Sequence, residues 1–551
     1  MVECAVLTCL LLLACAPQKD PTETPDGPVG DTDPETTTTT DTATSTGDCG
    51  TGEIWDDGGC VPEACGRGTW GTLSRAEDAA WVDGSAPEGG DGSRDFPVQT
   101  IESGLATRKQ FVFVAAGTYV ENVVVGGGVE LGGRCAELVT IDAGEDAVGV
   151  EAVGEADVHG FTVRSAAEVG VAVRDGGDLT LAGTVVEDST GVGILVDGRD
   201  AVLSAFEVTV QGTDADPDRG GGIGVSVQSG AVASMTSVVL DGNQQYGIYV
   251  RGFPSVAVLE KVTVRGTRPY EDGSYGRGVS AEAGGVVTGT ELTVDGNTEA
   301  GLWSSGDGSA ITVTESMVTG TRSAARYGVA MGVVGFDRGI LDFSGTISGT
   351  AGPGAVAQSS GSVSIHDEAV IEDSQFASLV VWDATATLRG VTLDGVVAQA
   401  SDTLTLGGGA AVYLQSAEGV SALTLDEVTV SGVLEGVYLM GPGAYLVQNS
   451  TLSGPRRGYG VYAAGGVSPW DGTTGLRILA DTVKDWEVGV LLEASSATVT
   501  DAVWFGNEVD VVQTGCSDAV PPIDGGGDLG VSVLCSDAVW PSFLPVWIPL
   551  G

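Results

Sequence analysis

Gly170–Trp303 contains six short apolar stretches that each begin with glycine: GVAV at 170–173, GILV at 193–196, GVSV at 224–227, GIYV at 247–250, GVSA at 278–281 and GLW at 301–303. Their glycines are separated by 23, 31, 23, 31 and 23 residues, so the pattern recurs every 54 residues as one short and one long unit. A second series keeps the same period, with Val-Thr-Val or a close variant at 208–210, 238–240, 262–264 and 292–294. A fixed period of this kind predicts stacked repeats that bury their apolar faces on one another.

The repeated segments predict β-strands. They are three to five residues long, rich in Val, Ile, Leu and Thr, and bounded by Gly, Asp and Asn. None of them sustains a period of about 3.6 residues, which a helix would need. Glycine at the start of each strand permits a sharp turn and a close approach of neighbouring coils. We therefore predict an all-β solenoid whose strands pair in parallel about 4.8 Å apart.

The chain resembles the right-handed parallel β-helix group, the pectin-lyase-like fold, over residues 90–515. Besides the repeat, the segments DGS at 91–93, PVQTIESGL at 97–105 and FVFVAAGTYVE at 111–121 are similar to the first coil of many bacterial members. The resemblance implies a right-handed parallel β-helix, which we place at residues 96–515. It implies no particular activity.

Both ends of such a stack need a cover, because open strand edges invite further pairing. Ile101 and Leu105 lie four residues apart, so Thr100–Thr107 is predicted to be a short amphipathic helix that forms the N-terminal cap. After Trp303 we expect further strands near Gly328, Ala355, Leu379, Ala411, Gly436, Gly460 and Gly489. Residues 516–551 are interpreted as the C-terminal cap, because their prolines cannot extend a ladder and their tryptophans can seal an apolar end.

Charge and composition limit the possible partners. The 551 residues carry a net charge of −51, which argues against nucleic acid and anionic membrane surfaces as partners. The 87 glycines show no triplet period, so they indicate many tight turns and not collagen. We expect a soluble, exported, acidic monomer.

The N-terminal residues resemble a bacterial lipoprotein signal. An apolar run at 5–14 leads into Cys15, so 1–15 would be the signal segment and Cys15 the lipidated residue of the mature chain. The run is too short to span a membrane. Residues 16–48 contain five prolines and eleven threonines and are predicted to be a disordered tether. These features predict a lipid anchor in the bacterial cell envelope as the one membrane contact.

The chain has nine cysteines. Three of them belong to the signal or take the lipid, which leaves Cys49, Cys60, Cys65, Cys135, Cys516 and Cys535. An even remainder in an exported chain predicts three disulfides, with fifteen possible pairings. We favour Cys516–Cys535 as a local link in the C-terminal cap, and Cys49–Cys60 and Cys65–Cys135 for the small cysteine-containing module at 49–95. A zinc site is disfavoured, because the chain has two histidines and no Cys-x-x-Cys.

The additional residues of the long coils fall at one phase of the repeat, at 213–222, 267–277, 321–327 and 454–459. Insertions at one phase emerge on one side of a solenoid. The arginines and tyrosines of these loops are Arg219, Arg268, Tyr270, Tyr275, Arg277, Arg322, Arg326, Tyr327, Arg456, Arg457 and Tyr459. Guanidinium groups match carboxylate or sulfate, and tyrosine rings stack on sugars, so we hypothesise that this side binds an anionic polysaccharide. The alternative is a solvated face whose arginines offset nearby acids.

Two acidic patterns have structural or metal interpretations. Asp214, Asp216 and Asp218 alternate in a loop, as in flexible calcium sites, although the spacing is not that of an EF-hand. A structural Ca²⁺ is the one cofactor considered. The turns Asp241-Gly242-Asn243 and Asp295-Gly296-Asn297 lie one period apart and are interpreted as the same structural turn.

No catalytic residue is assigned. His366-Asp367-Glu368 is the one acid–base cluster with a histidine, and it is more typical of an exposed turn; His159 is expected to be packed or partly exposed. The related fold includes polysaccharide lyases, polygalacturonases and uronate epimerases, but their catalytic patterns are not found. The sequence therefore favours a non-catalytic, lipid-anchored surface protein that binds or displays. A polysaccharide lyase or glycoside hydrolase acting on uronic-acid polymers is the alternative, and a pure spacer is a third possibility.

Overall fold

The structure, a computed structural model, describes residues 49–50, 53–56, 59–74, 78–144, 148–218, 220–326, 328, 330–396, 409–417, 421–468, 474–514 and 533–536. The predicted signal segment, the tether and most of the predicted C-terminal cap lie outside these residues. Within them the regular structure is almost entirely β-strand, which confirms the all-β prediction.

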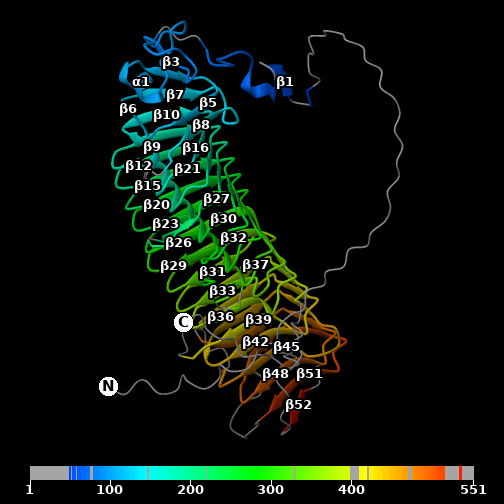
Figure 1. Ribbon diagram of the computed structural model, residues 1–551. Coiled ribbons are helices and arrows are strands. Elements are labelled where there is room, and N and C mark those ends of the chain that lie inside the picture. Colours follow the sequence, from blue (N-terminus) through cyan, green and yellow to red (C-terminus); the bar gives the residue numbers. More distant parts are fainter. Residues whose placement is uncertain are drawn as a thin grey trace, which may run out of the picture. The chain divides into compact units, whose positions relative to one another are not determined.

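Each regular coil consists of three strands that pair in parallel with the equivalent strands of the next coil, so three columns of strands run along the stack (Figure 1). Column 1 contains β6 (Val123–Gly126), β9 (Val148–Val153), β12 (Val169–Arg174), β15 (Val192–Asp197), β20 (Ile223–Gln228), β23 (Tyr246–Arg251), β26 (Arg277–Glu282), β29 (Ala300–Ser305), β31 (Met331–Phe336), β33 (Ala355–Gln358), β36 (Ala377–Trp382), β39 (Ala410–Gln415), β42 (Glu435–Met440), β45 (Tyr459–Ala464), β48 (Val488–Glu493), β51 (Val509–Thr514) and β52 (Val533–Ser536).

Column 2 contains β3 (Ala79–Val82), β4 (Phe111–Val114), β7 (Val129–Gly133), β10 (Glu155–His159), β13 (Asp178–Ala182), β16 (Val202–Phe206), β21 (Val232–Thr236), β24 (Val256–Glu260), β27 (Val286–Thr290), β34 (Ser362–Ile365), β37 (Thr385–Arg389), β40 (Ser421–Asp426), β43 (Gly443–Gln448), β46 (Gly475–Leu479) and β49 (Thr498–Thr500). Column 3 contains β5 (Gly117–Val120), β8 (Val139–Asp142), β11 (Thr162–Arg164), β14 (Val185–Glu187), β17 (Thr209–Gln211), β22 (Val239–Asp241), β25 (Thr263–Arg265), β28 (Thr293–Asp295), β35 (Val370–Glu372), β38 (Thr392–Asp394), β41 (Thr429–Ser431), β44 (Thr451–Ser453), β47 (Thr482–Lys484) and β50 (Val503–Phe505). The long strands β30 (Ala310–Thr319) and β32 (Ile340–Ser348) join columns 2 and 3.

The register follows the 54-residue period. Val225 pairs with Ile248, and Ile248 pairs with Val279, so the two valines lie two rungs apart in column 1. All three side chains are fully buried in one continuous apolar core inside the coils. The sequence period thus determines which residues stack on one another.

Buried asparagines connect successive coils at the turn that follows column 3. The Asn243 Oδ1 accepts a hydrogen bond from the backbone N–H of Thr213 (3.0 Å), and its Nδ2 donates to the carbonyl of Val210 (3.0 Å). Asn297 makes the same two bonds one period later, and both asparagines are buried. These hydrogen bonds agree with the structural interpretation of both turns, since each asparagine satisfies buried backbone groups.

The first coil is covered by α1 (Ile101–Ala106), close to the predicted limits. Thr100 is its N-cap and accepts a hydrogen bond from the N–H of Ser103, and the Glu121 carboxylate accepts from two further N–H groups at this end. Ile101 is fully buried in the core. The helix therefore caps the apolar interior.

The N-terminal module is an antiparallel hairpin of β1 (Glu53–Asp56) and β2 (Gly59–Pro62), followed by the 3₁₀ turn η1 (Glu63–Cys65). Disulfides join Cys49 to Cys60 and Cys65 to Cys135, the two pairings favoured for these four cysteines. Cys516 lies outside the described residues, so its pairing with Cys535 stays a prediction. The buried Arg134 links the module to the stack, because its Nη2 lies 2.7 Å from the Asp56 Oδ2.

Two strand positions differ from the sequence prediction. β3 already pairs in parallel with β4, so the stack begins at residue 79 and not at 96; its alanine-rich sequence carries little strand signal. The strand expected near Gly328 begins at Met331, because Leu302 pairs with Val333. Gly328 therefore belongs to the loop before β31, and the glycine within the column-1 strand is Gly332.

The outer face of column 1 is apolar over much of the stack. Side chains alternate along each strand, so in β36 Leu379 and Val381 face the core and Val380 faces the other side. Nine consecutive rungs carry an apolar residue at this outward position. We call these nine residues the outer strip: Trp303, Val334, Val356, Val380, Tyr413, Tyr438, Tyr462, Leu491 and Val512. Each of them is at most 5% exposed.

Candidate functional site

The long loops lie where the repeat places them, between column 3 and column 1. They span 212–222, 266–276, 320–330 and 454–458. The first contains a short antiparallel hairpin whose strands, β18 (Ala215–Asp216) and β19 (Gly220–Gly221), have two residues each. We call the first three the loop stack. Its loops recur every second coil, so they are spaced about 10 Å apart along the stack.

Side-chain and backbone contacts hold successive loops together. Gln244, in the tight turn between the first two loops, accepts a hydrogen bond from the N–H of Ala215 (2.8 Å) and donates to the carbonyl of Pro269 (3.2 Å). Gly273, at φ +79°, lies so close to the third loop that a Cβ atom would come within 2.9 Å of the Ala325 Cβ. The three loops therefore form one continuous surface.

Ion pairs also join loops that lie one full period apart. The Arg268 Nη2 is 2.5 Å from the Asp214 Oδ1, and its Nε donates to the carbonyl of Gly242. Arg326 donates to the Asp272 carboxylate in the next pair of loops. About half of each of these side chains is exposed, so the pairs contribute little to stability but orient both guanidinium groups.

The sequence predicts that Arg277 lies on the surface of the loops, but in the structure it is buried beneath them. Its Nη1 is 3.0 Å from the Glu282 Oε1, and its Nη2 is 2.9 Å from the Glu299 Oε1. The guanidinium carbon lies 3.7 Å from the centre of the Trp303 ring. Burial lowers the pKa of Arg277, but the charges of Glu299 and Glu282 outweigh burial and raise it. The structure therefore makes Arg277 a buried, paired cation.

Tyrosines on neighbouring rungs complete this cluster. The rings of Tyr246 and Tyr249 are stacked with centroids 4.6 Å apart, and Tyr275, which is 38% exposed, lies 5.5 Å from Tyr246. The Tyr249 hydroxyl donates to Glu282, while burial, followed by the charge of that carboxylate, raises the pKa of Tyr249 to about 12. The sequence analysis included Tyr275 but missed Tyr246, Tyr249 and both glutamates, although the register gives one signal: Tyr246 pairs with Arg277.

The other predicted ligand residues have different environments. Arg322 and Arg457 are exposed, and neither forms an ion pair with a carboxylate of the described residues. The Arg456 Nε is 3.6 Å from the Asp485 Oδ1. Tyr270 is half-buried, whereas Tyr459 is buried in the outer face of column 1, so it cannot stack on a ligand there. Arg219 and Tyr327 lie outside the described residues.

The three aspartates of the calcium hypothesis do not form a cluster among the described residues. Asp214 faces Arg268, and Asp216 accepts a hydrogen bond from the N–H of Asp218 (2.8 Å). A structural Ca²⁺ stays a prediction.

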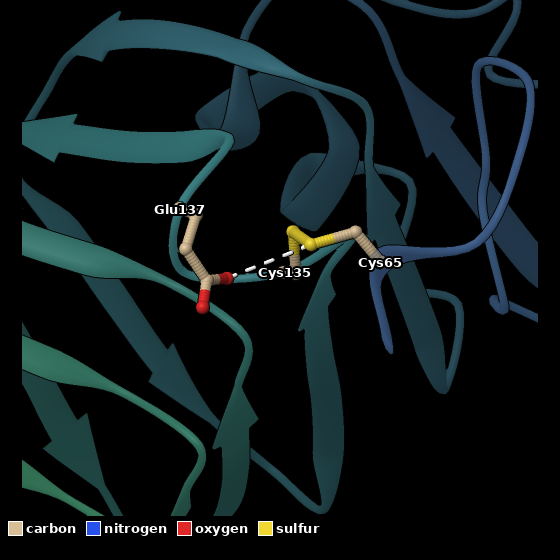
Figure 2. Close-up of side chains that lie close together, drawn as sticks. All are labelled: Cys65, Cys135 and Glu137. Carbon is tan, nitrogen blue, oxygen red and sulfur yellow. Dashed lines mark hydrogen bonds between the residues drawn. A yellow bond between two sulfur atoms is a disulfide. The ribbon is translucent and has the colours of Figure 1, made fainter. Parts of the chain in front are cut away.

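A group with the composition of a metal site lies at the N-terminal end of the stack. Figure 2 shows Cys65, Cys135 and Glu137 close together, with the Glu137 Oε2 3.6 Å from the Cys65 Sγ. The two sulfurs form a disulfide, so they offer no thiolate to a metal and no S–H to the carboxylate. We assign this group a structural role.

The two histidines each contact carboxylates. The His366 Nε2 is 2.8 Å from the Asp342 Oδ1, and its Nδ1 is 2.8 Å from the Asp367 Oδ2. Burial lowers the pKa of His366, but hydrogen bonds and charges from Asp367 and Asp342 outweigh burial and raise it. Asp367 and the next residue are exposed in a turn, as expected. His159, about one-third exposed, lies 3.3 Å from Glu130.

Two hollows lie away from the loop stack. One, of about 330 Å³, is lined by residues of the last coils, including Ser495 and Gln513. The other, of about 580 Å³, lies beside α1 and is lined by residues that include Arg108 and Lys109. Neither includes Arg277 or its two glutamates.

A family model described as "right handed beta helix region" matches residues 146–318. Among solved structures, pectate lyase Pel9A is 13% identical, with a TM-score of 0.36, over 59% of this chain and 78% of that one. The lacto-N-biosidase of family GH136 from Eubacterium ramulus is 11% identical, with a TM-score of 0.32, over 61% and 68%. The A-module of the mannuronan C-5 epimerase AlgE6 from Azotobacter vinelandii is 15% identical, with a TM-score of 0.24, over 73% and 93%.

No curated protein sequence matches the chain. The strand topology and the family match over residues 146–318 establish a right-handed parallel β-helix. Fold alone does not define activity. Among the described residues, no helix has the length and apolar character needed to cross a membrane.

Proposed function

We propose that this protein is an exported, lipid-anchored β-helix that binds an anionic polysaccharide along the loop stack without catalysing a reaction. Two ion pairs carry the proposal. Asp214–Arg268 and Asp272–Arg326 each join residues that lie one 54-residue period apart. Together with Gln244 they hold the loops in a repeated arrangement.

A periodic surface suits a periodic ligand. Loops about 10 Å apart can contact successive charged units of one linear polymer, and linked weak contacts raise the overall affinity. Arg322 is exposed, and the side chains of Arg268 and Arg326 are each about half exposed beside an aspartate. Because exposed ion pairs are weak, a ligand carboxylate can share these guanidinium groups. The half-exposed ring of Tyr275 adds a stacking surface.

The test compares two triple variants with the same change in charge. One replaces Arg268, Arg322 and Arg326 of the loop stack with serine. The control replaces Arg199, Arg338 and Arg389, which are exposed elsewhere on the stack, with serine. Retention on immobilised polygalacturonate and alginate is measured at increasing salt.

The loop variant is expected to lose retention, whereas the control keeps it. Equal retention by both variants contradicts the proposal. Equal loss contradicts it as well, because retention would then depend on net charge and not on the loop stack.

A second candidate function is a lyase or hydrolase acting on uronic-acid polymers. The observation that favours it is the Arg277 cluster, in which two glutamates and aromatic rings surround one cation; carboxylates and arginine are groups that such reactions use. Glu282 is the more accessible of the two glutamates, at 22% exposed. Unsaturated products or new reducing ends that disappear in Glu282→Gln would establish this function in place of the first.

Export and anchoring rest on residues 1–15 and on the disulfides, which suit an oxidising compartment. Replacing Cys15 with serine is expected to abolish the incorporation of labelled fatty acid and to release the protein from membranes. Unchanged incorporation contradicts the anchor.

A further inference from the structure

The hollow of about 580 Å³ beside α1 lies between the residues that follow the helix and the turn that joins β6 to β7. These elements lie side by side at the N-terminal end of the stack (Figure 1). Arg108 and Lys109 line one side of the hollow and the glycines at 126–128 line the other, and Asp78 is its one carboxylate. A volume of this size is in the range of small-molecule sites.

The side chain of Arg108 is exposed and has no partner among the described residues. Its backbone follows the helix in the left-handed conformation, at φ +59°, and its N–H donates to the carbonyl of Leu105 (3.0 Å). Glycine is the usual residue at this place, because it adopts the conformation at little cost. The arginine side chain is therefore not needed to end the helix, and its cation is available to a ligand.

Lys109 brings a second positive charge to the hollow. Its Nζ donates to the carbonyl of Ala79 (2.8 Å), which fixes a half-buried ammonium group. The carbonyl carries no net charge, and Lys109 forms no ion pair with a carboxylate of the described residues. The whole chain has 24 lysines and arginines against 75 acidic residues, so most of its surface repels anions, whereas two adjacent cations here lack a paired carboxylate.

The glycine wall leaves the hollow open. Gly127 and Gly128 have φ values of +71° and +75°, and a Cβ atom on either would meet no heavy atom within 4 Å. No side chain of this turn therefore competes with a ligand for the space in front of the two cations.

We propose that this hollow binds a small anion, a molecule of at most monosaccharide size that carries a carboxylate, sulfate or phosphate group. A guanidinium fork and a fixed ammonium group both form charge-assisted hydrogen bonds to such oxyanions. None of the lining residues belongs to the loop stack, so the site does not depend on the function proposed for the loops.

The test is isothermal titration of the full chain with galacturonate, sulfate and inorganic phosphate in turn, at low ionic strength, where charges are least screened. At least one of the three is expected to bind with a stoichiometry of one. Arg108→Gly preserves the left-handed turn and should weaken binding roughly tenfold, the loss of one charge-assisted hydrogen bond. Arg338→Gly is the matched control, because Arg338 is exposed at φ +67° in another turn, and it should bind as the unchanged chain does.

A second pair of variants changes the charge of the hollow and not its shape. Gly127→Asp and Gly127→Asn introduce side chains of similar size, and both residues tolerate the left-handed conformation. Only the aspartate should abolish binding, because it places a carboxylate in front of the cations. This pair decides the question even if Arg108→Gly is less stable, since its two members differ by a single charge.

Four results would overturn the proposal. The first is that none of the three anions binds the unchanged chain. The second is equal affinity of Gly127→Asp and Gly127→Asn. The third is an equal loss in Arg108→Gly and Arg338→Gly, which would mean that only net charge matters. The fourth is loss of binding in the loop-stack triple variant, which would place the anion on the loops and not in the hollow.

Discussion

Replacing Arg277 with methionine should destabilise the column-1 region around β26 and β29 strongly. The substitution keeps an apolar stem over Trp303 but leaves Glu299, which is only 2% exposed, without its cation. Removing one partner of a buried ion pair costs about 3 to 5 kcal/mol, because the other charge stays buried and uncompensated. Glu282 loses less, since it is partly exposed and also accepts hydrogen bonds from the hydroxyls of Tyr249 and Ser280.

A double-mutant cycle isolates this cost. Arg277→Met is combined with Glu299→Met, which removes both buried charges, and the free energy of unfolding is measured for all four proteins in urea. The double variant should recover most of the loss, because an apolar pair can replace a buried ion pair at little cost. Since a stacked array can unfold in parts, amide hydrogen exchange in β26 and β29 provides the local free energy of opening.

Arg268→Met serves as the matched control, because Arg268 belongs to an exposed pair and should change stability little. The reasoning is refuted if Arg277→Met costs less than about 1 kcal/mol, the range of exposed pairs. If Arg277→Met loses polysaccharide retention while its stability is unchanged, Arg277 would instead be assigned to the ligand-binding surface.

Other predictions concern buried groups, the disulfides and calcium. Asn297→Ala leaves two buried backbone groups without partners and should cost about 2 to 4 kcal/mol in urea unfolding; a loss below about 0.5 kcal/mol would show that water replaces the side chain. Burial raises the pKa of Glu435 from its ordinary 4.5 to about 7, so the folded protein holds a proton that the unfolded chain has lost, and the side chain destabilises the fold increasingly between these pH values. Glu435→Gln should therefore gain about 3 kcal/mol at pH 8 and almost nothing at pH 4.5, and a gain that does not depend on pH would contradict this reasoning. Replacing Cys65 and Cys135 with serine opens a 70-residue loop and should cost about 4 kcal/mol, measured as the protection of the N-terminal module from protease; unchanged protection would mean that the other contacts of the module suffice. If the aspartate loop binds calcium, Tb³⁺ luminescence should disappear in Asp216→Ala, whereas a melting temperature that does not respond to calcium argues against the site.

Much of the fold could be predicted because a solenoid is nearly one-dimensional. Each rung contacts the rungs next to it, so a 54-residue period is enough to place Val225 two rungs from Val279 and all long loops on one side. The helical cap over Ile101 was predictable for a similar reason, since its apolar spacing is local.

The arginines show where this reasoning ends. Arg268, Arg277 and Arg326 look equivalent in the sequence, yet two lie half-exposed beside aspartates and one lies buried between glutamates. Their roles depend on which acids the neighbouring rungs bring into ion-pair distance, and Glu299 carries no local signal of its proximity to Arg277.

The repeat, the direction of the side chains along each strand and the side on which the loops emerge all follow from local periodicity, so they can be read from the amino-acid order. Which charges pair and which apolar side chains are covered depends instead on residues of other coils, and these come together only in the folded chain. The outer strip is the clearest case: Val380 and Thr387 are both outward-facing residues of one coil, yet the first is buried and the second is exposed, a difference that the alternation along their strands does not predict.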